Sequence, residues 1–489
     1  MTVITAQRTL TQRAGEAALW QILGGGWQTI VRMGASVFLA RALKPSDFGL
    51  FGMAILFQEF LLNITALGMG AGIIAKKEVS KDDLNTCFWT IACVRIFLFL
   101  LAFLGAPLAA LFFKEPRLVG VVRVSSFCFL IHLFGIVPNI LLSKELRFKT
   151  LNIINGITVL FESFVAVFLA LTTDLAYWSL VIAMLVNAIF SNLIIFIFVN
   201  WVPNFKFDKE SFHYLFRFGI HGLGFSITNY LKQNLDYLLV GRILGTYQLG
   251  LYEFAYKIPH LVVARISRPV GAVVFPSLAK IQEDNEKIFN AYVMIVKFVT
   301  LIAFPVLFGL LALADILVLV LWGDQWLPII RPMQILCLCA ALRCIVQPLG
   351  AIFLCKNRPD IPNITSFVEL IVTAITVSIM GYFWNITGIA IGMLLSVLPS
   401  FIVLYIGFRL IKANIFRFFI SIFKTFFTAL LCGIFVWFVK KTLLYLNLNL
   451  VTILSLSVVS GGIIFLILVL FFFKDELFLL KNILFNCKL

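Results

Sequence analysis

Charged residues are scarce in this chain. They make up 13 % of its 489 residues, and hydrophobic residues make up 62 %, whereas about a quarter of the residues in a soluble globular protein are charged. Apolar runs of roughly 18 or more residues recur along the whole sequence, as membrane-spanning helices require. The alternating apolar and polar residues of a membrane β-barrel are missing. The composition excludes a soluble protein and predicts an all-α protein that crosses a bilayer many times.

Residue patterns that carry chemistry are also missing. The four histidines are scattered, and none stands near a cysteine or an acid in a catalytic or metal-binding pattern, so we expect them to serve packing or the membrane interface. The nine cysteines lack zinc-ligand spacing and are expected to pack as buried thiols. No predicted outer loop is long enough for an enzyme domain. We therefore expect no enzymatic activity, no metal and no bound cofactor.

The net charge of +16 does not indicate nucleic-acid binding. Lysine and arginine lie mainly in short loops between apolar runs, as the positive-inside bias of membrane proteins requires. No basic helix or RNA-binding motif is present. The N-terminal sequence has no pattern of a cleavable signal peptide, so we expect the first span to act as the insertion signal.

Fourteen spans are predicted from the apolar runs. Their approximate residue ranges are 17–40, 48–74, 87–113, 118–142, 151–172, 176–199, 212–240, 249–278, 288–313, 328–355, 362–384, 387–408, 418–439 and 450–473. With the loops assigned alternately to two sides, about 21 lysines and arginines share the side of the termini and about 9 lie opposite. This asymmetry favours an even number of spans, with both termini in the cytoplasm.

A repeated segment divides the chain into halves. Residues 39–54 and 240–255 align at one offset, so that Arg41 matches Arg242 and Gly49 matches Gly250. Six predicted spans separate the copies, which indicates a parallel repeat, and transporters with such halves bind substrate between them. We expect an N-terminal lobe at 1–205, a C-terminal lobe at 206–412, and two further helices with a cytoplasmic tail at 413–489. The glycines fit a tight turn or a close helix contact.

Charges inside the predicted spans indicate a polar cavity. A charged side chain in a membrane span is costly and usually faces a bundle interior or a watery cavity. The predicted cavity residues are Arg32, Glu59, Arg95, Glu162, Lys232, Asp236, Lys257, Arg265 and Arg268. The same residues also allow a purely structural arrangement, in which Arg32 pairs with Glu59 and Lys232 with Asp236.

Three of the cavity residues lie on one helix. Lys257, Arg265 and Arg268 follow a single stripe of the eighth span. Such a stripe suits an anionic ligand, because the arginine fork matches phosphate oxygens. Arg32 and Arg95 could add to it from the first half.

An ordered series of segments resembles a known family. The matching stretches are LARALKPSDFGLFGMA (39–54), LLSKELRFKTLNII (141–154), NLDYLLVGRILGTYQLGLYEFAYKIP (234–259), RPVGAVVFPSLAKIQEDNEK (268–287), LWGDQWLPIIRPMQILCL (321–338) and QPLGAIFLCKNRP (347–359). Together, over about residues 15–410, the chain resembles bacterial polysaccharide flippases of the multidrug/oligosaccharidyl-lipid/polysaccharide exporter superfamily. It looks most like the colanic-acid and teichuronic-acid type.

The resemblance implies a fold and a cargo. The fold would be two six-helix lobes plus two helices, and the cargo an undecaprenyl-diphosphate-linked oligosaccharide moved to the outer leaflet of the bacterial inner membrane. It also implies coupling to a proton or sodium gradient, contact with membrane lipid, and cooperation with a polysaccharide polymerase and a chain-length regulator. The positions that match the family are Asp236, Gly241, Arg242, Arg41, Asp47 and Gly49. The family's glycine-arginine-proline stretch here reads Asn357-Arg358-Pro359, without the glycine.

Three other functions remain as alternatives. A multidrug or cation antiporter of the same superfamily would need an acid-dominated cavity, whereas cations outnumber acids in these spans. A peptidoglycan-precursor flippase would perform the same chemistry on another cargo. A membrane polysaccharide polymerase or ligase would carry a sizeable outer loop with arginine or histidine residues.

Overall fold

The computed structural model describes residues 10–64, 69–220, 223–358 and 360–473, and these ranges contain helices and no strand. The contacts divide the chain into two compact units. Unit 1 comprises residues 1–234 and 245–250, and unit 2 comprises 235–244 and 251–489. The predicted fold class, an all-α membrane protein, is confirmed.

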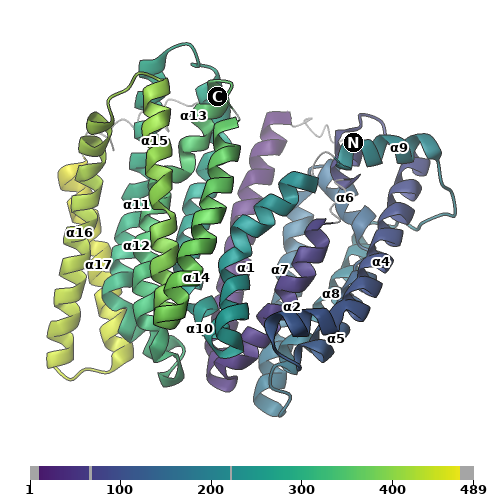
Figure 1. Cartoon of the computed structure of the whole chain (residues 1–489), viewed down its shortest axis with the longest axis horizontal. Coiled ribbons are helices and arrows are strands. Elements are labelled where there is room, and N and C mark those ends of the chain that lie inside the picture. Colours follow the sequence, from purple (N-terminus) through teal and green to yellow (C-terminus); the bar gives the residue numbers. More distant parts are fainter. Residues whose placement is uncertain (1–9, 65–68, 221–222, 359, 474–489) are drawn as a thin grey trace, which may run out of the picture. The chain divides into compact units, whose positions relative to one another are not determined.

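The described residues of unit 1 form nine helices and the beginning of a tenth. They are α1 (Leu10–Ala42), α2 (Pro45–Ile64), α3 (Met69–Ala75), α4 (Lys81–Phe113), α5 (Leu118–Ile131), α6 (Ile136–Lys144), α7 (Phe148–Thr172), α8 (Trp178–Phe198), α9 (Lys209–Ile220) and the first part of α10 (Leu223–Ala279). Helix α1 packs along α7, α7 along α8, and α4 along α5 (Figure 1).

A buried acid joins three segments at one end of unit 1. Asp83, in the first turn of α4, accepts hydrogen bonds from Lys76 Nζ at 2.7 and 2.8 Å and from Ser211 Oγ of α9 at 2.6 Å. It also completes a capping box with Ser80, which satisfies backbone N–H groups that a helix start leaves open. Hydrogen bonds from Ser211 hold the pKa of Asp208 below its ordinary value. The loop before α4 and the start of α9 are thereby fixed to one carboxylate.

Unit 2 contains the remaining helices. They are the rest of α10, α11 (Asn285–Leu321), η1 (Asp324–Ile329), α12 (Ile330–Val346), η2 (Gln347–Leu349), α13 (Gly350–Cys355), α14 (Asp360–Ser396), α15 (Leu398–Leu410), α16 (Ile415–Tyr445) and α17 (Leu450–Phe472). Helix α10 breaks at Gly245, where φ is +80°, and α14 breaks at Trp384 and Asn385. Each of these breaks therefore falls at the boundary between two of the spans that the sequence predicts.

Helix α16 is fixed to α11 along its whole length. Arg417 contacts Glu286 at 2.6 Å near one end, and the hydroxyls of Thr300 and Thr425 lie 3.2 Å apart in the buried middle. Near the other end, Lys440 Nζ contacts Asp315 at 3.0 Å. Helix α17 packs on both α11 and α16, and the two yellow-green helices lie side by side in Figure 1. The last two helices thus belong to the compact body of unit 2.

Eight helical segments of the described ranges are long and apolar enough to cross a membrane, and the bent pair α5 and α6 gives up to nine. Helices α1 and α10 are not among them, and both carry several charged residues. Many large apolar side chains are exposed, and Leu104, Leu108 and Leu111 of α4 are each at least 70 % exposed. Such a surface suits contact with lipid tails.

Candidate functional site

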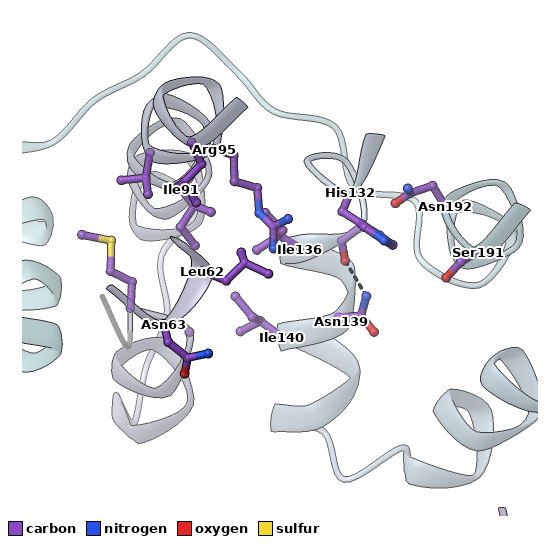
Figure 2. Close-up of a pocket in the computed structure, with 15 residues that line it drawn as sticks. Leu62, Asn63, Ile91, Arg95, His132, Ile136, Asn139, Ile140, Ser191 and Asn192 are labelled. Atoms are coloured by element: carbon purple, nitrogen blue, oxygen red, sulfur yellow. Dashed lines mark hydrogen bonds between the residues drawn. The ribbon is translucent and has the colours of Figure 1, made fainter. Parts of the chain in front are cut away.

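A cavity of about 560 Å³ lies inside unit 1 (Figure 2). Helices α2, α3, α4, α6 and α8 and the link between α5 and α6 form its wall. The lining residues are Leu62, Asn63, Met69, Gly70, Ile91, Val94, Arg95, Leu98, His132, Gly135, Ile136, Asn139, Ile140, Ser191 and Asn192. The cavity therefore combines an apolar wall with a few amide, hydroxyl and cationic groups, which is typical of ligand sites.

A broken span forms one side of the cavity. Helices α5 and α6 meet at a 53° bend, and a break inside a membrane exposes backbone groups that need partners. Asn192 Nδ2 donates to the carbonyl of Ile131 at 2.8 Å, and Asn139 Nδ2 donates to that of Gly135 at 2.8 Å (Figure 2). A Cβ at Gly135 would lie 2.3 Å from Asn192 Oδ1. Glycine therefore lets Asn192 approach and hold the bend.

The cavity wall carries positive and no negative side chains. Among the lining residues, Arg95 and His132 can bear positive charge, and none is an aspartate or glutamate. Both are half-buried, and within the described ranges neither side chain has a hydrogen bond or an ion pair. In Figure 2 the Arg95 guanidinium extends from α4 toward α6. An arginine fork without a protein partner favours an anionic ligand, because it matches phosphate and carboxylate oxygens.

A second polar group in unit 1 is paired internally. Arg32 of α1 contacts Glu162 of α7 at 3.5 Å, and Glu162 also accepts a hydrogen bond from Asn187 of α8 at 2.6 Å. The predicted pairing of Arg32 with Glu59 is wrong, because α1 packs on α7 and so brings Arg32 to Glu162. Glu59 is exposed and does not line the cavity.

Asp236 is buried in a cluster of tyrosines in unit 2. It is 2 % exposed and accepts a hydrogen bond from Tyr252 at 2.7 Å, which ties the two sides of the break in α10. The Tyr252 ring stacks on Tyr256, whose hydroxyl accepts a hydrogen bond from Arg343 at 3.2 Å. The Arg343 Nε is buried without a partner in the described part of the chain.

Three other predicted cavity residues are divided between the two units. Lys232 is grouped with unit 1, whereas Lys257 and Arg265 belong to unit 2. The Lys257 ammonium lies 5.0 Å from the centre of the Phe254 ring, and Arg265 is exposed. The side chain of Arg268 lies outside the described residues. Of the nine predicted residues, Arg95 is the one that lines the described cavity.

Sequence reasoning missed most of the polar cavity lining. It assigned His132 to packing or the interface and did not single out Asn139, Ser191 or Asn192. The available signal was the glycine and proline of HLFGIVPN (132–139), which mark a possible break in an apolar run. Within the described ranges, no group of histidine, cysteine and acidic residues is arranged to hold a metal ion.

The described ranges thus form a bundle of apolar helices of membrane-spanning length, with a cavity whose arginine has no protein partner among the described residues. The chain belongs to the family described as polysaccharide biosynthesis protein, whose model matches residues 38–331. It is 26 % identical to the teichuronic acid biosynthesis protein TuaB of Bacillus subtilis, over 94 % of this chain and 96 % of that protein. It is 27 % identical to the lipopolysaccharide biosynthesis protein WzxC of Escherichia coli, over 79 % of each chain.

Solved structures share the fold at lower identity. The lipid II flippase MurJ, in an inward closed conformation, matches with a TM-score of 0.73 and 15 % identity, over 94 % of this chain and all of that chain. An inward-facing multidrug transporter of the MATE family matches with a TM-score of 0.61 and 15 % identity, over 79 % of this chain and 94 % of that chain. The chain therefore shares the fold of these proteins, and its family is the one described by polysaccharide biosynthesis.

Proposed function

We propose that this protein flips undecaprenyl-diphosphate-linked oligosaccharide units across the bacterial inner membrane by alternating access, for the synthesis of a surface polysaccharide. Its relatives are named for teichuronic acid and lipopolysaccharide biosynthesis, and another is named the succinoglycan biosynthesis transport protein ExoT of Rhizobium meliloti. Both termini face the cytoplasm in this proposal. A proton or sodium gradient returns the empty carrier, and a polymerase and a chain-length regulator take over the product.

The unpaired Arg95 in the cavity of unit 1 carries the proposal. A diphosphate or acidic sugar cannot enter the hydrocarbon core without a polar path. Arg95 and His132 provide positive donors, and Asn139 and Ser191 provide amide and hydroxyl groups suited to sugar. The lipid tail needs no such path, because it is soluble in the bilayer. Flipping requires no bond to form or break, so no catalytic group is needed.

The same observation argues against the cation antiporter. A site for organic cations would be expected to present carboxylates, and the described cavity is lined by none. The half-buried Glu162 of unit 1 is already engaged by Arg32 and Asn187. The proposal therefore favours an anionic cargo.

Substitution of Arg95 tests the proposal. A hydrogen bond to a charged group is worth about 1.5–3 kcal/mol, or roughly ten- to a hundredfold in affinity at 1.4 kcal/mol per decade. Arg95→Ala is expected to lower surface polysaccharide by at least that lower factor, and Arg95→Lys to restore part of it. The measurement is surface polysaccharide in a host that lacks its own flippase, together with lipid-linked oligosaccharide retained in the membrane.

Arg123→Ala is the matched control. Arg123 is an exposed arginine of α5 whose guanidinium lies 5.2 Å from the Phe103 ring, and it does not line the cavity. Its substitution is expected to leave export unchanged. Full export by Arg95→Ala, at the wild-type amount of protein in the membrane, would contradict the proposal that the cavity lies on the transport path.

A further inference from the structure

Each copy of the internal repeat contains a glycine and, four residues before it, a position that matters for the contact described below. The offset that aligns Gly49 with Gly250 also aligns Pro45 with Thr246. Each pair stands one helical turn apart at the start of a helix. Residues 245–250, although they come from the second repeat, are grouped with unit 1 by their contacts.

The glycines make a reciprocal backbone contact. A Cβ built on Gly49 would lie 1.8 Å from the carbonyl oxygen of Thr246, and a Cβ built on Gly250 would lie 1.8 Å from that of Pro45. The two Cβ positions also lie 3.0 and 3.1 Å from the amide nitrogen of the opposite glycine. Each glycine therefore points a hydrogen at the carbonyl of the other repeat copy, and neither position leaves room for a methyl group.

The surroundings of the contact are tightly packed. Phe48 and Leu50 flank the first glycine and Leu249 and Leu251 the second, and each is at most 8 % exposed. Gly245, with φ at +80°, turns the chain of α10 immediately before the contact, in a conformation that residues with a Cβ rarely adopt. The close approach is thus built into the local backbone of both repeat copies.

The glycine contact itself contains no interlocking side chains, so neither glycine has to change a rotamer when it parts. Glycine faces that meet through backbone groups gain from close approach and Cα–H···O contacts. Interdigitated side chains, in contrast, must change rotamers together when a packed surface opens. The loop-charge pattern predicts that residues 41–47 and 242–247 lie at the outer ends of their helices, where a transporter that alternates access must close and open.

We propose that Gly49 and Gly250 form a backbone clasp that closes the outer side of the transporter and parts to release cargo. The proposal rests on the proposed alternating access. It makes the internal repeat a functional pair, in which each copy supplies one glycine and one carbonyl. Any side chain at either glycine prevents closure and shifts the population toward the outward-open state.

Alanine at either glycine tests the clasp. Gly49→Ala and Gly250→Ala are expected to lower export and to speed the reaction of a cysteine at Ser46 with a membrane-impermeant maleimide. The increase should be about tenfold, which is the effect of 1.4 kcal/mol on a population. The double variant should label no faster than the stronger single variant, since one contact is lost in all three. Gly34→Ala and Gly309→Ala are the controls, because a Cβ there meets nothing within 4 Å.

The maleimide reaction separates the two proposals, because it needs no cargo. Wild-type labelling in both glycine variants would overturn the clasp, even if export were lost. Faster labelling without any effect on export would leave the clasp in place and count against the proposed function.

A second measurement covers variants that fail to fold. Cysteines at Ser46 and Tyr247, in a chain without its native cysteines, are bridged by reducible cross-linkers of increasing length. A short bridge should stop export and reduction should restore it. Undiminished export with a short bridge in place would also overturn the clasp.

Discussion

Removal of the Asp83 carboxylate is expected to destabilise unit 1 strongly. The Asp83 side chain is 2 % exposed, and it holds Lys76, Ser80 and Ser211 at once. Asp83→Ala removes the acceptor of all three donors. Because Lys76 and Ser80 belong to the approach to α4 and Ser211 belongs to α9, a single substitution releases two separate segments.

The size of the effect follows from these contacts. Breaking a buried ion pair costs about 3–5 kcal/mol, but the Lys76 side chain is 37 % exposed and can regain water, so the lower end applies. Loss of the capping interaction is part of the same change and is not added. The expected cost is about 3 kcal/mol, or roughly 6–12 °C in the melting temperature of a domain of this size. Asp83→Asn keeps an acceptor oxygen and should lose about half as much.

Thermal unfolding can be followed through a cysteine close to the substitution. Cys87 is fully buried one turn along α4 from Asp83, so a thiol-reactive fluorophore reports the opening of this region. The other eight cysteines are first changed to serine, so that the fluorophore reports on Cys87. Asp82→Ala is the control, because Asp82 is half exposed and its contact with Lys206 is 3.9 Å long.

Comparing the melting temperatures of Asp83→Ala and Asp82→Ala tests whether the contacts of Asp83 stabilise unit 1. The reasoning fails if Asp83→Ala and Asp82→Ala melt within about 1 °C of each other, since a surface pair is worth little. A double-mutant cycle with Ser211→Ala adds a further check. The coupling between Asp83 and Ser211 should exceed 0.5 kcal/mol, as expected for groups in direct contact.

Two other outcomes are expected. Lys440→Met should lower the melting temperature by an amount equivalent to about 1–2 kcal/mol, because Lys440 Nζ also caps the carbonyl of Ala312 at 2.8 Å. Lys441→Met, at the neighbouring position whose ammonium lies over the Trp437 ring, should change the melting temperature little. Equal effects of the two substitutions would contradict the stabilising role of Lys440. Cysteines at Lys44 and Lys81 should react with an impermeant maleimide from opposite sides of the membrane, and reaction from one side would contradict the proposed orientation.

The helical spans could be predicted because a single chain segment in the lipid core can satisfy its backbone hydrogen bonds only as a helix. Every backbone group in the hydrocarbon core must be satisfied within the segment, so apolar length translates directly into helix. The predicted span at 212–240 covers most of α9 and the first part of α10, and the span at 249–278 lies in the second part of α10, after the break at Gly245. The spans at 362–384 and 387–408 similarly meet at the break of α14 and continue into α15.

The bend at the cavity was not predictable in the same way. Residues 118–142 were predicted as a single span, because a hydropathy average over many residues does not show a local break. Gly135 and Pro138 were visible, but both residue types are frequent in unbroken membrane helices. What fixes the bend is Asn192, a residue of another helix whose proximity the sequence does not reveal.

The sequence did not show which residues pair with the buried charges, for the same reason. Helical spacing states which residues share a face, but not which helix that face meets. Arg32 finds Glu162 because α1 packs on α7. His132 enters the cavity because the chain bends beside α4. The internal repeat, in contrast, could be recognised in the sequence. The reciprocal contact of Gly49 and Gly250 explains why glycine stands at this position in both copies.

The attachment of α16 to α11 limits where a lipid tail can pass. Ionic contacts join the two helices near both ends, and the hydroxyls of Thr300 and Thr425 meet in the middle. A prenyl chain that slid between them would have to separate all three levels at once. These contacts therefore oppose the entry of a lipid tail between α11 and α16. Under the proposed function, the lipid tail of the cargo has to pass along a different pair of helices.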